Sequence, residues 1–434
     1  MSTVGHGTAA PRARNYSQGS AMAWWVWILA VTFVVYLFSF QTDYAIVNES
    51  VRSDLSLSIE QVGTIAAIYT WAFAVCQFFG GALLDRLGSR KVLPASIALV
   101  TVGIFLFANA NSYPMLLLSQ IVVAIGSCTG FVGAGYVGGK WFGMAKFSFM
   151  FGLVQVFAAL TSAFSQNLIA LALTHTTWRG LFNGTAVFGI LLLVLGAIYI
   201  RDPVPVVSNA RAGVGEFFSS VLRSMLQVAR IGHVWLASLY GATTFGVMLA
   251  LGVVWAPQLL KVHGLSDMTA SLGASMLWLG LAVGSVVFPR WSDVTRGRKV
   301  PMLVGAVLQL LALLGLLYLP LGTGLAFALC FIFGFANGAH MLAFSTAADV
   351  VPPSHIGTSA AIVNGIMFII GGVLIARPGV RIALGLEQGI EPASLALAQY
   401  AAVPSIGALV ISVVLAAVMR ETYPAANATE LREA

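Results

Sequence analysis

Two ionisable side chains lie within long apolar stretches of this 434-residue sequence, and both could exchange protons. Asp43 follows Gln41 in "SFQTDYAIV", and His340 follows Asn337 by one helical turn in "GFANGAHMLAF". Ionisable groups are costly in such segments and typically mark proton or solute pathways. These four residues are therefore candidates for proton coupling or substrate binding. The alternatives are a structural acid near the outer surface and a structural histidine whose hydrogen bonds are satisfied.

Other polar residues of the apolar stretches could line a solute pocket. Arg377 and Arg381 form an i, i+4 pair around Pro378, which could attract an anion or could extend to the outer membrane interface. Asn364 and Tyr240 are further candidates, because each places a polar group inside an apolar run. Arginine, asparagine and tyrosine side chains can bind a solute through charge and hydrogen bonds, so these residues are candidates for substrate binding.

The sequence lacks the residue groups that an enzyme, a primary pump or a metal site would need. It has no paired acids at depth, no H-E-x-x-H motif and no ATP-binding motif. Its three cysteines, Cys76, Cys128 and Cys330, form no C-x-x-C pair and no Cys/His cluster. We expect no enzymatic activity, no metal site and no cofactor.

The composition places these residues in a membrane protein. Hydrophobic residues make up 59% of the chain and charged residues 9%, whereas a soluble domain has about 25% charged residues. Twelve apolar runs are long enough to cross a bilayer, and they must be helices because a lone strand leaves backbone groups unpaired in lipid. The sequence therefore predicts an all-α membrane protein with 12 transmembrane helices. The predicted spans are 24–46, 61–84, 92–110, 114–138, 147–171, 180–200, 231–256, 270–289, 300–320, 323–347, 358–382 and 395–419.

The net charge of +7 reflects membrane topology rather than a nucleic-acid partner. With the N-terminus inside and the spans alternating, the outer side holds only five of the 22 basic residues, namely Arg52, Arg179, Lys261, Arg377 and Arg381. Segments on the cytoplasmic side of membrane proteins carry such an excess of Lys and Arg. We expect a bacterial inner-membrane protein with both termini in the cytoplasm, a first span that is not a cleaved signal peptide, and no nucleic-acid partner.

A polar segment, 201–230, separates six spans from six others. Within it, 216–230 has apolar residues near helical spacing, which predicts a short amphipathic helix on the cytoplasmic surface. Six plus six spans indicate an internal duplication, in which a substrate site lies between the halves near the bilayer midplane. We expect two pseudo-symmetric six-helix bundles, 24–200 and 231–420, a cytoplasmic linker, 201–230, and cytoplasmic tails, 1–23 and 421–434.

A charged, glycine-rich motif joins the second and third spans. The stretch "GGALLDRLGSRK" contributes Gly81, Asp85, Arg86, Gly88, Arg90 and Lys91. A partial copy between the eighth and ninth spans, "PRWSDVTRGRK", retains Asp293, Arg298 and Lys299. Gly81 allows two helices to approach closely, Asp85 can face a helix N-terminus or an arginine, and Gly88 permits a turn with positive φ.

The motif, its position and the twelve-span pattern together resemble the major facilitator superfamily. The family pattern at this place is approximately G-x-L-x-D-R-x-G-x-R/K, and 81–91 fits it except that Ser89 replaces a usual base. In the second copy, Pro289 replaces the leading glycine and Gly297 is shifted by one position. The resemblance implies two helical bundles and a latch that joins them when the protein opens outward. The alternative is that the charges only fix topology.

Two further stretches are similar to the anion/cation symporter and organophosphate antiporter branches of that family. These are "GVVWAPQLL", 252–260, and "YAIV" after Asp43. The phosphate exchangers have an arginine in span one and another in span seven, where this sequence has Gln41 and about Leu249. The resemblance therefore disfavours the exchange of phosphate esters.

The sequence predicts a secondary active transporter that moves a small solute by alternating access and functions as a monomer in the lipid bilayer. An organic anion or an amino acid is the expected substrate class, with proton coupling through Asp43 or His340 as an option. Two alternatives remain. One is a non-transporting sensor or assembly protein on the same fold, and the other is an iron or metal-ion carrier of a specialised membrane.

Overall fold

The fold is built from helices that are long and apolar enough to cross a membrane, and their number confirms the predicted twelve. The computed structural model describes residues 19–204 and 214–423. Within these ranges all regular elements are helical. The predicted amphipathic segment forms α8 (Val214–Ala229), which packs against the ends of α2 (Ile59–Leu87) and α15 (Ile356–Glu387).

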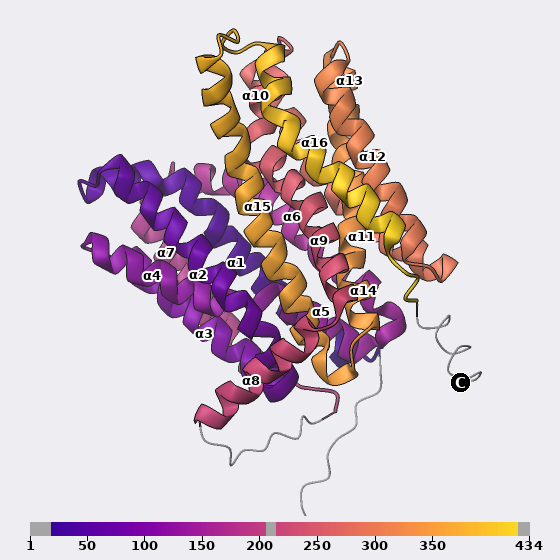
Figure 1. The fold of residues 1–434 in the computed structure, drawn as a ribbon. Helices are drawn as coiled ribbons and strands as arrows, with labels where there is room; N and C mark the ends of the chain where they lie inside the picture. The colour runs from indigo at the N-terminus through magenta and orange to yellow at the C-terminus, as the bar shows by residue number, and fades with distance from the viewer. Residues whose placement is uncertain (1–18, 205–213, 424–434) are drawn as a thin grey trace, which may run out of the picture.

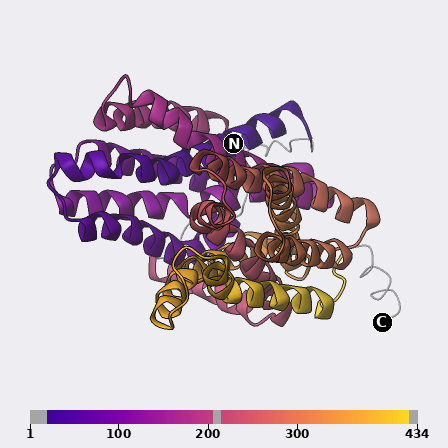
Figure 2. The same ribbon diagram turned by 90° about the horizontal axis from the view of Figure 1, so that it is seen from above.

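The helices form two groups that follow one another in sequence (Figure 1). The first group contains α1 (Ala21–Asp54), α2, α3 (Ser89–Ala108), α4 (Tyr113–Ser127), α5 (Gly130–Phe142), α6 (Phe147–Ala172) and α7 (Trp178–Tyr199). The second contains α9 (Gly232–Ala250), α10 (Ala256–Val262), α11 (Asp267–Thr295), α12 (Lys299–Tyr318), α13 (Thr323–Asn337), α14 (Leu342–Asp349), α15 and α16 (Leu395–Val418). Seen from above, the two groups lie side by side (Figure 2).

The fourth span of each group is interrupted near its middle. Residues 128–129 separate α4 from α5, and a 3-10 turn, Gly338–Met341, separates α13 from α14. The seventh span contains a π-helical turn, Leu251–Trp255, just before Pro257. Proline cannot donate the backbone hydrogen bond of a regular helix, and a π-turn accommodates that loss. The interruption in the tenth span contains His340, one of the residues predicted to bind solute or protons.

The two groups contact one another along α2 with α15 and along α6 with α11. These contacts lie toward the end of the molecule that carries α8, and the helices of the two groups diverge toward the opposite end (Figure 1). We refer to these as the α8 end and the far end. Glycines allow the close packing, because a Cβ on Gly81 would collide with the carbonyl of Gly357, and one on Gly152 with that of Ser285.

The motif between the second and third spans is almost entirely helical, contrary to the expected loop. α2 ends at Leu87, α3 begins at Ser89, and only Gly88 lies between them, with φ of 76°. A residue with a Cβ is strained at this φ. Gly88 therefore has the predicted role in a tight turn.

Candidate functional site

Six phenylalanines meet where the two groups of helices join. They surround a cavity of about 10 Å³ together with Gln155, His340, Asn364 and Met367. We call these lining residues the aromatic cluster, and its rings are Phe38, Phe73, Phe131, Phe245, Phe344 and Phe368. Both groups contribute, since α1, α2, α5 and α6 supply four lining residues and the second group supplies the others.

Ring contacts close the aromatic cluster across the boundary between the two groups. Phe73 of α2 meets Phe368 of α15 edge to face at 5.0 Å, and Phe151 of α6 stacks on Phe344 of α14 at 4.8 Å between centroids. A cavity of about 10 Å³ is at the lower limit for a single water molecule. A solute can therefore enter this place only when rings or helices move.

His340 is the titratable member of the aromatic cluster. It is 1% exposed, and its ring stacks on Phe245 with centroids 4.7 Å apart. Its Nδ1 lies 2.7 Å from the backbone oxygen of Asn337. A carbonyl oxygen can only accept, so Nδ1 carries the proton of the neutral ring and Nε2 is the atom that can gain one. The sequence predicted that Asn337 lies one helical turn from His340, and the structure shows that the contact is made by the Asn337 backbone carbonyl.

Two amide side chains near His340 are buried and have polar atoms without a hydrogen-bond partner in the part of the chain that the structure describes. Asn364 lines the aromatic cluster, and its Nδ2 has no acceptor within reach. Asn337 is also buried, with neither amide atom paired, but it is not among the lining residues. A buried unpaired amide is costly, and a bound polar ligand would remove that cost.

The other predicted pocket residues lie elsewhere. The Tyr240 hydroxyl donates to the carbonyl of Met302 at 2.8 Å, so Tyr240 joins α9 to α12 and does not line the cluster. Arg381 lies over the ring of Tyr400 and donates to its carbonyl. Arg377 is exposed. Because an α-helix turns by about 100° per residue, Arg377 lies about 140° around the axis of α15 from Asn364, on another face of the helix.

The remaining candidates are in the outer part of the first span. Gln41 is half-buried in α1 and is absent from the lining of the cluster. Asp43 lies in the same helix, beyond the apolar segment Ala21–Gln41, and its side chain lies outside the described residues. Its expected role in proton coupling therefore stays a prediction.

Asp85 connects the two groups at the α8 end. Its carboxylate accepts hydrogen bonds from the backbone N–H groups of Gly357 and Thr358 at 2.9 and 2.7 Å, and from the Thr358 hydroxyl at 2.8 Å. These donors lie in the first turn of α15, whose own N-cap residue, His355, makes no side-chain capping bond. Asp85 thus caps a helix of the other group, where the helix dipole favours a negative charge.

The other residues of the motif hold the same region together. Arg86 donates to the Ser220 carbonyl and the Ser224 hydroxyl of α8, each at 2.7 Å. Arg90 and Lys91 are exposed, as expected for residues in a headgroup region. Asp202, which follows α7, accepts from the backbone and hydroxyl of Ser89 at 2.8 and 2.7 Å. Sequence reasoning missed this acid.

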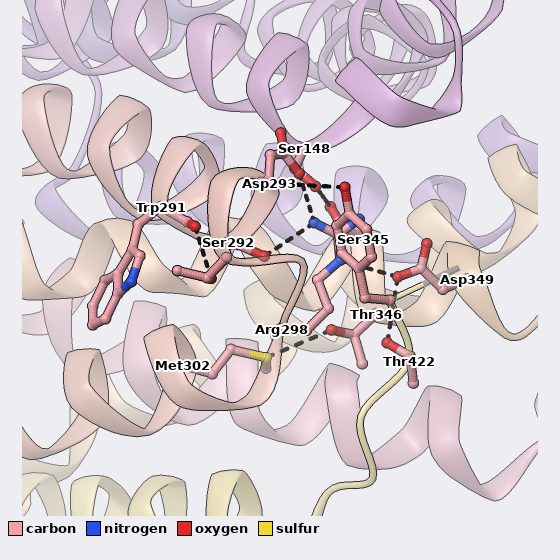
Figure 3. A network of polar contacts seen from close by, with 12 residues as sticks. Ser148, Trp291, Ser292, Asp293, Arg298, Met302, Ser345, Thr346, Asp349 and Thr422 are labelled. Atoms are coloured by element: carbon pink, nitrogen blue, oxygen red, sulfur yellow. Dashed lines mark hydrogen bonds and ion pairs between the residues drawn. The ribbon is translucent and has the colours of Figure 1, made fainter. Parts of the chain in front are cut away.

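The second copy of the motif forms a buried ionic network within its own group (Figure 3). Arg298 is 2% exposed and donates to Asp293 at 2.9 Å, to Asp349 at 3.0 Å and to Ser292 at 3.1 Å. Asp293 therefore pairs with a neighbouring arginine, whereas Asp85 reaches the opposite group. Lys299 contributes its backbone N–H, which donates to Glu421 at 3.2 Å.

Acids that follow the last helix of each group occupy equivalent places. Asp202 caps the start of α3, and Glu421 caps the start of α12 by accepting from the backbone of Arg298 at 2.8 Å. Burial raises the pKa of Glu421, but four backbone donors outweigh it and hold that pKa below its ordinary value. The short similarity between "RDP" at 201–203 and "RETYP" at 420–424 is the sequence signal that could have revealed both acids.

A larger cavity lies away from the junction. It has a volume of about 400 Å³ and is lined only by residues 250–405 of the second group, including Trp255 and Ala401. No lining residue comes from the first group. The aromatic cluster, although smaller, is therefore the better candidate for a site whose access depends on movement between the groups.

Comparison with known proteins identifies the family. The model of the Major Facilitator Superfamily matches residues 28–376. The chain belongs to this superfamily. Membership confirms the resemblance seen in the sequence, and together with the twelve helices that could cross a membrane it confirms the predicted fold class of this major facilitator protein.

Individual relatives of this superfamily member are distant. The probable galactarate/D-glucarate transporter GudP of Bacillus subtilis is 25% identical over 304 residues, which cover 61% of this chain and 65% of GudP. The probable galactarate/D-glucarate transporter GarP of Escherichia coli K12 is 21% identical over 376 residues, 78% of this chain and 83% of GarP. The chain matches less than two thirds of the length of the first relatives found.

A solved structure supports the same fold. The human organic anion transporter MFSD10 (TETRAN) superposes with a TM-score of 0.67 at 14% identity, over 92% of this chain and all of that one. At this identity the likeness concerns the fold alone. Together with the family match, it places the aromatic cluster at the junction between the two halves of a major facilitator fold.

Proposed function

We propose that this protein is a secondary transporter of small organic anions that works by alternating access. The observation that carries the proposal is the aromatic cluster, because a site shared by both helix groups changes its exposure when the groups rock against each other. The organic-anion class is supported by relatives whose names refer to sugar diacids.

Residues 24–200 and 231–420 would be the two moving bodies. The bonds between Asp85 and the start of α15 would hold the α8 end closed, and α8 would brace it through Arg86. The excess of basic residues supports a cytoplasmic location of the α8 end and of both termini, in a bacterial inner membrane. The protein would function as a monomer, without cofactor.

His340 would couple transport to protons. A carboxylate that approaches Nε2 needs a proton on that atom, because the Nδ1 proton is already held by the Asn337 carbonyl. Anion binding and protonation of His340 would then favour one another, as linkage requires. Asp43 stays a second candidate for this role.

His340→Gln tests the coupling. In liposomes containing purified protein, we expect an inward proton gradient to drive accumulation of a labelled carboxylate by the unchanged protein. The variant should retain exchange of the solute but lose gradient-driven accumulation, because glutamine has no titratable group. His175→Gln changes an exposed histidine and serves as the matched control. Accumulation by His340→Gln at the level of the unchanged protein would exclude this residue.

Asp85→Asn tests the latch. The substitution removes the charge from an acceptor of three hydrogen bonds, each worth roughly 1.5–3 kcal/mol and not additive. We expect the population closed at the α8 end to fall by on the order of tenfold or more. Spin labels at Thr176 and Glu391, in a variant without the three native cysteines, would report a shorter distance across the far end.

The control for Asp85→Asn is Asp202→Asn. Asp202 also caps a helix, but that helix belongs to its own group. Asp202→Asn should therefore lower the stability of the protein without changing the distance between the spin labels. An equal distance shift in both variants would contradict the latch.

A further inference from the structure

We infer that the transported anion has an apolar, preferably aromatic body and a single carboxylate, and that polyhydroxylated diacids are poor substrates. This inference rests on the proposed function and concerns the substrate class of the same site. It departs from the names of the similar transporters, which refer to galactarate and D-glucarate.

The walls of the aromatic cluster favour an apolar body. Six of its lining residues are phenylalanines, and the methionine Met367 adds another apolar side chain. A hydroxyl that leaves water for such a wall without a hydrogen bond costs roughly 1–3 kcal/mol in proteins. A sugar diacid carries several hydroxyls, so most of them would face phenyl rings. A phenyl ring instead fits the edge-to-face and stacked geometries that these rings already adopt.

The polar groups of the aromatic cluster suffice for one carboxylate. The lining contains no lysine and no arginine. The buried Nδ2 of Asn364 is a donor without an acceptor in the described part of the chain, and His340 supplies a second donor when Nε2 is protonated. Gln155 is the remaining polar side chain. A second carboxylate would be left without a cationic partner, which is expensive in a buried site.

The predicted cationic residues do not change this conclusion. Arg381 lies against Tyr400 of α16, at 4.0 Å from its ring. Arg377 lies on another face of α15 from Asn364 and is exposed. Arg298 is held by Asp293 and Asp349 within the second group. None of the three is a member of the aromatic cluster.

The orientation of the bound anion follows from these placements. The carboxylate would lie between His340 and Asn364, and the ring would lie beside Phe245, which already stacks on the imidazole. Phe73 and Phe368 come from opposite groups and would close over the ring. The Phe73–Phe368 contact would then bind the body of the solute and make the packing between the two halves depend on whether solute is bound.

Competition in liposomes tests the inference on the full-length protein. The probes are benzoate, cyclohexanecarboxylate, galactarate and the neutral benzamide. We expect benzoate to be transported, cyclohexanecarboxylate to be weaker by a few-fold, and galactarate to compete at least about tenfold less well than benzoate, since one unmatched buried hydrogen bond already has that effect. Benzamide should not be accumulated, because it lacks the charge.

Variants assign the effect to this site. Asn364→Leu should weaken benzoate competition roughly tenfold through the loss of a donor to a charged group. Phe245→Leu should weaken benzoate about two- to tenfold and cyclohexanecarboxylate less, because only the former loses an aromatic pair. Phe188→Leu changes an exposed phenylalanine of α7 and is the matched control.

The outcomes separate the inference from the proposed function. Galactarate transport that exceeds benzoate transport would overturn the inference and leave organic-anion transport intact. Folded protein that transports none of the three anions would overturn the proposed function and the inference with it. Equal benzoate competition in the unchanged protein, Asn364→Leu and Phe245→Leu would overturn the assignment to the aromatic cluster.

Discussion

Gly81→Val is expected to reduce transport by at least about tenfold while the protein remains folded. A Cβ at position 81 would collide with the carbonyl group of Gly357 and crowd Ala361, both in α15. Backbone atoms cannot move aside as a flexible side chain can, so α2 and α15 must separate at the α8 end. Because the helices of each group also pack extensively against one another, the cost falls on the state in which the groups touch.

The expected cause is a change of conformation, which can be measured directly. Spin labels at Thr176 and Glu391 should show the far end closed in Gly81→Val, as for Asp85→Asn but more completely. Gly372→Val is the control, because a Cβ at that position in α15 has no atom within 4 Å. Unchanged transport by a well-folded Gly81→Val protein would show that closure at the α8 end is not part of the transport cycle.

Arg298→Met is expected to lower the free energy of unfolding by about 3–5 kcal/mol. The arginine side chain is 3% exposed and pairs with two carboxylates, of which Asp349 is equally buried. Removing one partner of a buried ion pair leaves an uncompensated charge, which is the reason for a cost of this size. Here two acids would be left close together. Thermal unfolding of the purified protein in detergent would measure the loss.

Two further variants show whether charge is the cause. Arg298→Lys should recover only part of the stability, because an ammonium group cannot match the fork by which Arg298 bonds Asp293, Asp349 and Ser292. Arg223→Met removes an exposed arginine of α8 and should change the free energy by less than about 0.5 kcal/mol. A loss in Arg298→Met no larger than in Arg223→Met would refute the structural role of the network.

The two copies of the duplicated motif have diverged in chemistry. The Asp85 carboxylate accepts hydrogen bonds from backbone N–H groups of the opposite half. Asp293 instead forms an ion pair with Arg298 in its own half. Breaking the first contact should therefore change the conformational equilibrium, and breaking the second should change stability. The experiments on Asp85 and Arg298 separate these two consequences.

The residues of the candidate site differ in how far sequence could find them. His340 was predicted because an ionisable residue in an apolar run is unusual. The six phenylalanines were not, since the chain has 27 of them and each resembles any other apolar residue of a span. Asp349 and Glu421 were missed because they lie at helix ends, where acids are ordinary. Tyr240 was predicted for the pocket on its polarity, but its hydroxyl bonds to a backbone carbonyl inside the second group.

The sequence by itself determined the number of membrane-spanning helices, their division into two similar halves and the position of the charged motif between the second and third spans. These features depend on local hydrophobicity and on a repeat within the chain, because lipid requires each span to satisfy its own backbone. Only the tertiary structure decided that Asp85 caps α15 and that phenylalanines from both halves enclose His340. Such contacts join residues far apart in the chain. The periodicity of apolar residues predicts that a side chain is buried, but it does not predict which residue that side chain contacts.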